Sequence, residues 1–368
     1  MNNNNNFNMN FFNMNNNMNN QFNFQQNNIQ CPYKPIITNT NIKDINESTF
    51  INSVLQSLAS FNCIYNWIKS KNQQVLTMTQ NLKITKELYN LFYFLYSGQF
   101  ADSSNFILNF FNAFKYKYQN INLKQDPYHF LFYLFDIIHS EDNSPLNPNY
   151  DATILNSQSL VTQRNKFSMR NLFTKFLEQS QNSIISNNFY NIFGQEIKCN
   201  NCPSLFYDSF KYIIKFKLDD YKKYRDEAYP NKKNENLNLD ECFECFTGGN
   251  NSQCNNCGNL QRKTFISFVR SAKILVIALI RMNHIYKCDL DFKNKYNINA
   301  FLEYGIANYK NYFLKACISL NNQGKYFSDI FINGFWFRFY ENNLSMLNNV
   351  NVEIHQYEPQ LLFYELEN

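Results

Sequence analysis

Two short cysteine pairs most constrain how this chain can fold. Cys199 and Cys202 form one pair and Cys254 and Cys257 the other, and two asparagines separate the cysteines in each. A tight polar turn of this kind presents two thiolates to one metal ion. Two such turns complete the tetrahedral four-sulfur site that zinc prefers. We therefore predict one structural zinc ion that joins two distant segments of the chain.

A third pair, Cys242 and Cys245, encloses Phe243 and Glu244. An aromatic residue between the cysteines suits a helix or strand better than a tight turn. Two alternatives to the predicted zinc site stay open: ordinary free cysteines, or a site that includes Cys242 or Cys245. No basic segment followed by an apolar one begins the chain, so we expect an intracellular protein, cytoplasmic or nuclear and not secreted, in which cysteine pairs favour metal over disulfides.

The first half of the chain has the apolar spacing of helices. Between residues 48 and 58 the apolar side chains recur at helical intervals, and Ser48 or Thr49 is a natural N-cap for this helix. Asp126 followed by Pro127 is typical of the start of another. We expect helices throughout residues 41–190.

Short apolar runs replace this pattern from about residue 193. Six of them are predicted as strands, at 206–218, 263–269, 274–280, 313–320, 329–332 and 361–366. Helices followed by an antiparallel sheet predict an α+β fold.

The N-terminal segment differs from the rest in composition. Sixteen of its first thirty residues are asparagine, and no charged residue precedes Lys34. Such a segment buries too little apolar area to offset the entropy cost of ordering. We predict a disordered, asparagine-rich tail over 1–35 and a folded domain over 36–368. The net charge of +5, spread without basic stripes, and the absence of a long apolar run give no reason to expect nucleic-acid or membrane partners.

Several segments, in order, resemble the ubiquitin-specific proteases, the ubiquitin carboxyl-terminal hydrolases of peptidase family C19. They are the first sequence box at 41–58, whose second half matches closely, the Gln-Asp box at 125–131, the two cysteine pairs, the strand at 271–282 and the closing strand at 361–365. The resemblance implies a papain-like cysteine-proteinase fold. Its helical thumb would span about 41–190, its zinc-bearing fingers about 193–270 and its antiparallel β palm about 271–368.

The resemblance also implies that the catalytic positions are degenerate. Thr49 replaces the nucleophilic cysteine, Lys325 the histidine, Tyr340 the aspartate or asparagine that orients it, and Asp44 the asparagine of the oxyanion hole. A hydroxyl is a weaker nucleophile than a thiolate, an ammonium is no base, and a carboxylate repels an oxyanion. Glu341 would serve as the acid only if the match is shifted by one residue. Cys63 is too far from the helix start to replace the nucleophile.

A scaffold without this chemistry is expected to bind ubiquitin or another protein partner and leave it intact, as a pseudo-deubiquitinase. The alternatives are an active ubiquitin hydrolase with a displaced catalytic group, and a structural scaffold that ignores ubiquitin. The resemblance places Asp126 near the channel for ubiquitin's arginine-bearing tail, although His129 stands where the family has glutamate. A simple N-cap is an equally good interpretation of Asp126. His129 and His139 are expected to be packed or surface residues of helices.

Overall fold

The computed structural model divides the chain into two units, Met1–Cys31 and Pro32–Asn368, and everything described below lies in the second. The structure describes residues 48–75, 83–99, 101–119, 121–146, 166–248, 251–254, 257–260, 262–281, 290–303, 310–341 and 343–367. The predicted tail over 1–35 and Asp44 lie outside these residues.

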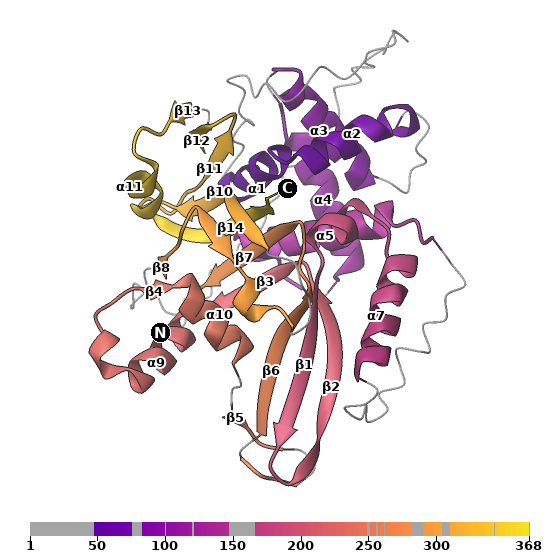
Figure 1. The fold of residues 1–368 in the computed structure, drawn as a ribbon. Helices are drawn as coiled ribbons and strands as arrows, with labels where there is room; N and C mark the ends of the chain where they lie inside the picture. The colour runs from indigo at the N-terminus through magenta and orange to yellow at the C-terminus, as the bar shows by residue number, and fades with distance from the viewer. Residues whose placement is uncertain are drawn as a thin grey trace. The chain divides into compact units, whose positions relative to one another are not determined.

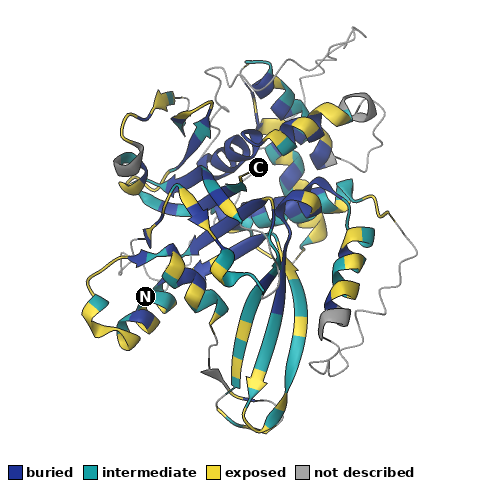
Figure 2. Ribbon diagram, in the orientation of Figure 1, coloured by how far each residue is buried: buried dark blue, intermediate teal, exposed yellow. Residues whose placement is uncertain are grey.

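Helices make up the N-terminal part of the described chain. They are α1 (Thr49–Ala59), α2 (Asn62–Val75), α3 (Lys83–Tyr96), α4 (Ser104–Lys117), α5 (Pro127–Asp142), α7 (Lys166–Ser180) and α8 (Ile184–Phe189). Every residue of α1 is buried, because this helix packs against α5 on one side and the large sheet on the other. Figure 2 shows α1 as buried along its length. A polar residue on α1 therefore faces protein rather than bulk water.

The large sheet follows the order β13 (Asn343–Met346), β12 (Phe335–Tyr340), β11 (Tyr326–Ile332), β10 (Asn311–Leu320), β14 (Glu358–Leu366), β7 (Ile274–Ile280) and β3 (Ile213–Lys217), with β9 (Lys295–Asn297) also paired to β10. The sheet is antiparallel except that β3 runs parallel to β7. This pair departs from the antiparallel palm expected from the sequence. The chain leaves β3, completes the smaller sheet and returns as β7, and such a long crossover permits a parallel pairing.

The smaller sheet has the order β2 (Cys202–Lys211), β1 (Asn191–Cys199), β6 (Arg262–Arg270) and β5 (Asn251–Ser252). It extends from the palm as a long antiparallel ribbon, with α7 beside β2 (Figure 1). The single strand predicted over 206–218 is wrong, because the chain breaks between β2 and β3 at Tyr212. The Tyr212 ring packs against Phe132 and Phe135 of α5, with ring centroids 5.8 and 6.1 Å apart.

Short elements fill the connections, and of these the sequence indicated only the one around Cys242. They are α9 (Leu218–Ala228), η1 (Pro230–Lys232), β4 (Leu237–Asn238), α10 (Leu239–Thr247), β8 (Leu290–Asp291), η2 (Asn299–Phe301) and α11 (Val350–His355). Helix α10 carries Cys242 and Phe243 into the core beside the palm. The helical setting of Cys242 agrees with the expectation from Phe243. Helices packed on largely antiparallel sheets confirm the α+β prediction.

Candidate functional site

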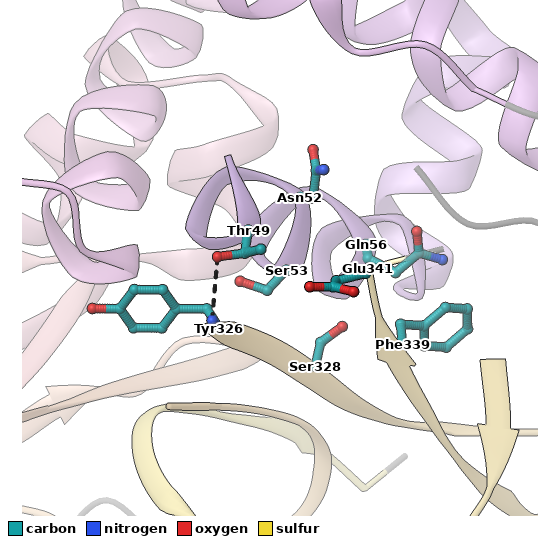
Figure 3. A pocket seen from close by; sticks show the side chains of 8 residues that line it. All are labelled: Thr49, Asn52, Ser53, Gln56, Tyr326, Ser328, Phe339 and Glu341. Atoms are coloured by element: carbon teal, nitrogen blue, oxygen red, sulfur yellow. Dashed lines mark hydrogen bonds between the residues drawn. The ribbon is translucent and has the colours of Figure 1, made fainter. Parts of the chain in front are cut away.

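The site begins where α1 starts. Ser48 holds the N-cap position, yet its side chain makes no capping hydrogen bond. Thr49 is the first helical residue, and its hydroxyl oxygen accepts a hydrogen bond of 3.2 Å from the backbone N–H of Tyr326 (Figure 3). The predicted N-cap position at Ser48 is confirmed, but the expectation that the Thr49 hydroxyl caps the helix is wrong. The Thr49 side chain instead forms a hydrogen bond that connects α1 to β11.

Lys325 lies beside this contact, in the turn between β10 and β11. Its backbone N–H donates to Asn321 Oδ1 at 2.9 Å, and Gly324 has a positive φ of 76° that the turn requires. The Lys325 ammonium forms an ion pair with the Glu341 carboxylate. This pair links the β10–β11 turn to the turn after β12, so Lys325 acts here as a counter-ion.

Tyr340 ends strand β12 and does not enter the site as an acid. Its hydroxyl donates to Gln323 Oε1 at 3.3 Å, and its ring lies edge-on to Phe327. The carboxylate that reaches the site comes from the next residue, Glu341, whose φ is +51°. The structure thus brings Thr49, Lys325 and Glu341 to the same end of the large sheet.

A small pocket lies between the underside of α1 and the sheet. Its lining consists of Thr49, Asn52, Ser53, Gln56, Tyr326, Ser328, Phe339 and Glu341 (Figure 3). It has space for roughly one water molecule. No imidazole or thiol belongs to this lining, which is dominated by hydroxyl, amide and carboxylate groups. The pocket can accept hydrogen bonds, but its lining supplies no thiolate and no imidazole base.

Ser328 and Gln56 are pocket residues to which sequence reasoning gave no role. Gln56 lies in the first sequence box, but helical spacing alone did not show which way it points. No motif or spacing in the sequence around Ser328 indicates that its side chain lines a pocket. The alternation of β11 places its side chain on the same face as that of Tyr326, and that geometry becomes visible only once the strand is paired.

The described histidines lie elsewhere. The ring of His139 contacts Ser183 Oγ through Nδ1 and Gln181 Oε1 through Nε2, both at 2.6 Å. Burial lowers the pKa of His139. His355 packs on the ring of Phe292 at a centroid distance of 4.2 Å. These contacts are those of packed side chains, and no described histidine lines the pocket.

Two thiols near the core are held in the neutral form. Cys63, on α2, has its pKa raised to about 12, chiefly by burial and then by the charge of Glu365. Cys317, on β10, also has its pKa raised to about 12 by burial. A nucleophilic cysteine needs a lowered pKa. Neither thiol therefore has the properties of a displaced nucleophile.

Asp126 is the N-cap of α5. One carboxylate oxygen accepts the His129 N–H at 2.8 Å, and the other lies 2.5 Å from His129 Nδ1. The ammonium of Lys215 lies 4.3 Å from the centre of the Tyr128 ring; burial lowers the pKa of Lys215, and the charge of Asp126 acts to raise it. Both oxygens of Asp126 therefore bind within the first turn of the helix.

The four cysteines of the predicted zinc site come together at the end of the smaller sheet. Their sulfur atoms lie within 4.8 Å of one another, with Cys199 and Cys257 sulfurs 3.5 Å apart and Cys202 and Cys254 sulfurs 3.9 Å apart. Tetrahedral zinc with bonds of about 2.3 Å requires sulfurs about 3.8 Å apart. The cluster therefore has the dimensions of a four-sulfur zinc site.

The turns that hold these sulfurs differ. Cys199 pairs with Cys202 across the β1–β2 hairpin. In the second turn, the Gly258 N–H donates to the Cys254 carbonyl at 2.8 Å, and the positive φ of Gly258, 72°, suits glycine. Cys242 and Cys245 lie on α10 and are not part of the cluster.

Comparison with protein families identifies the architecture. The model of the ubiquitin carboxyl-terminal hydrolases matches residues 40–364. The chain belongs to this family. A comparison of the sequence with curated proteins found no match. Among the described residues, no helix has both the length and the apolar character needed to cross a membrane.

Solved structures of the same fold include the yeast SAGA DUB module. One chain of this module, from a complex with mutant Sgf73, aligns with a TM-score of 0.62 and 16% identity. The alignment covers 89% of the present chain and 68% of the chain from the module. A second structure, of the Ubp8/Sgf11/Sus1/Sgf73 module bound to monoubiquitin, aligns with a TM-score of 0.63 and 17% identity. The alignment covers 93% of this chain and 72% of the other. The predicted fold of the ubiquitin-specific-protease type is confirmed.

Proposed function

We propose that this chain is a non-catalytic member of the ubiquitin carboxyl-terminal hydrolases, a pseudo-deubiquitinase that binds ubiquitin or a ubiquitinated protein without cleaving it. The observation that carries this proposal is the bonding at the start of α1. There the Thr49 hydroxyl accepts from a backbone N–H, and the Lys325 ammonium pairs with Glu341. A hydroxyl nucleophile needs an adjacent base, and neither contact provides one.

The fold supports ubiquitin as the partner. A structure similar to this one belongs to a module bound to monoubiquitin, and another to a module bound to ubiquitin aldehyde. The role of Asp126 in holding a cationic tail has weaker support, because its carboxylate already binds His129. We place the binding surface on the fingers and palm, over about 193–270 and 271–368, within a domain spanning 36–368 behind a disordered tail. The proposed location is cytoplasmic or nuclear.

The first test is an NMR titration of isotope-labelled ubiquitin with the full chain. We expect shifts in ubiquitin's hydrophobic patch and C-terminal tail, while ubiquitin stays intact. The absence of shifts at high micromolar protein would overturn the ubiquitin proposal and favour a scaffold for other proteins.

A second measurement tests the lack of catalysis. We expect no hydrolysis of a fluorogenic ubiquitin conjugate above the buffer rate, for the wild type and for Thr49→Ala alike. Turnover by the wild type that Thr49→Ala abolishes would establish an active hydrolase with a displaced base. Turnover that Thr49→Ala leaves unchanged would mean that Thr49 is not the nucleophile, and a mock purification from cells that do not express the chain would distinguish a displaced nucleophile from a contaminating enzyme.

A further inference from the structure

The four cysteines at the end of the smaller sheet differ in how far they are exposed. Cys254 is buried and Cys199 and Cys202 are partly buried, whereas Cys257 is exposed. Peroxides oxidise those cysteines that are both accessible and in the thiolate form. A zinc ion keeps its sulfur ligands deprotonated. Cys257 therefore meets both conditions when the cluster, whose dimensions fit zinc, holds the metal.

The other cysteines that the structure describes should react slowly with an oxidant. Burial raises the pKa of Cys63 and Cys317 to about 12 and that of Cys245 to about 11, so these thiols stay protonated near neutral pH. Cys242 is buried on α10. Protonated and buried thiols are poor nucleophiles toward a peroxide. Oxidation is therefore directed to the cluster.

A second thiol lies close to Cys257. The sulfur of Cys199, at the end of β1, is 3.5 Å from that of Cys257, so the two need to approach by about 1.5 Å to reach the length of a disulfide bond. Each sulfur projects from a turn that has its own backbone pairing. Cys199 pairs with Cys202 across the β1–β2 hairpin, and the Cys254 N–H donates to the Asn259 carbonyl at 2.7 Å. A disulfide between Cys199 and Cys257 would thus join the same two turns as the zinc ion does.

We propose that Cys257 is a site of reversible oxidation, at which hydrogen peroxide converts the zinc-bound thiolate into a sulfenic acid and Cys199 then forms a disulfide with it. In the first step the Cys257 thiolate attacks one peroxide oxygen, and the O–O bond breaks to release hydroxide. In the second step the Cys199 thiolate attacks the Cys257 sulfur, and a second hydroxide leaves. The peroxide is reduced, the two thiolates are oxidised, and two protons from solvent convert the hydroxides into water. Cys202 and Cys254 alone do not supply the four ligands that structural zinc requires, so the metal is released.

Titration of the zinc-loaded full chain with hydrogen peroxide tests the proposal. A chromogenic chelator measures the released zinc, and mass spectrometry of alkylated peptides maps the disulfides. We expect about one zinc ion released per peroxide consumed, with the link between Cys199 and Cys257 as the first disulfide, and return of bound zinc after reduction by a thiol. Zinc that stays bound under excess peroxide would overturn the proposal. Any other first disulfide, such as one between Cys254 and Cys257, would overturn the assignment of the two partners.

Two matched variants locate the first attack. Cys257→His and Cys202→His each leave three cysteines and one histidine, a ligand set that structural zinc accepts. We expect zinc release by peroxide to be about tenfold slower in Cys257→His, because its exposed ligand is no longer a thiolate. Cys202→His should release zinc at the wild-type rate, since Cys199 and Cys257 remain. Equal rates in the two variants would refute Cys257 as the oxidised residue. If either histidine variant fails to bind zinc, the disulfide map of the wild type decides alone.

Discussion

Cys254→Ser is expected to abolish zinc binding and to unfold the tip of the smaller sheet. Cys254 is 6% exposed, and among the described residues the short strand β5 pairs with β6 only at Asn251 and Ser252. Zinc binding supplies about 10–16 kcal/mol in small zinc-finger peptides. Most of the order in this region should therefore depend on the metal. We expect less than a tenth of the wild-type zinc content and a Tm lower by about 10 °C or more.

Metal analysis of the full chain, with calorimetry, measures both effects. The wild type should contain about one zinc per chain. Cys245→Ser is the matched control, because it makes the same chemical change on α10, outside the cluster, and should keep its zinc. Loss of zinc in Cys245→Ser would show that the site includes the third cysteine pair. A metal-free wild type, or a Cys254→Ser protein of unchanged stability, would contradict the zinc assignment.

The sequence predicted those turns and helix ends that depend on residues close together in the chain. The spacing of Cys199 and Cys202 encodes a tight turn, and Asp126 before Pro127 encodes a helix start that the structure confirms. Each of these signals lies within a few residues of the feature it specifies. The order of five such segments was sufficient to indicate the family, whose model matches most of the chain.

Features that depend on distant pairing were not predictable in this way. Helix α9 has only Leu218 and Arg225 buried, so it lacks an apolar stripe. Its anchor is the Arg225 guanidinium, which binds the Asn236 carbonyl and the Glu241 carboxylate on the next helix. The Thr49 hydroxyl likewise looked like a helix cap, because its actual donor, Tyr326, is far away in sequence.

The second large effect concerns Arg338 on β12. Its guanidinium binds the Asp329 carboxylate through two hydrogen bonds of 2.8 and 2.9 Å, and Asp329 is 0% exposed. The same guanidinium lies over the rings of Phe327 and Tyr357, 4.5 and 4.9 Å from their centres. Asp329 is next to Ser328, so this ion pair also fixes the strand beneath the pocket.

Arg338→Leu is expected to lower the free energy of unfolding by about 3–5 kcal/mol at pH 8, because it leaves a buried carboxylate without its counter-ion. Urea unfolding followed by circular dichroism measures this change. Arg338→Lys should recover only part of the loss, since an ammonium cannot form the same paired hydrogen bonds. Asp329→Asn combined with Arg338→Leu should be more stable than Arg338→Leu alone.

The pH dependence separates the lost charge pair from the lost packing. Burial raises the pKa of Asp329 to about 6, although Arg338 acts to lower it, so removing Arg338 raises this pKa further. A carboxyl whose pKa is higher in the folded than in the unfolded state favours folding at low pH, and this contribution disappears as the pH rises through the folded-state value. The destabilisation by Arg338→Leu should therefore be smaller at pH 5 than at pH 8. Equal losses at the two pH values would mean that packing on Phe327 and Tyr357, rather than the neutralisation of Asp329, is what Arg338 contributes.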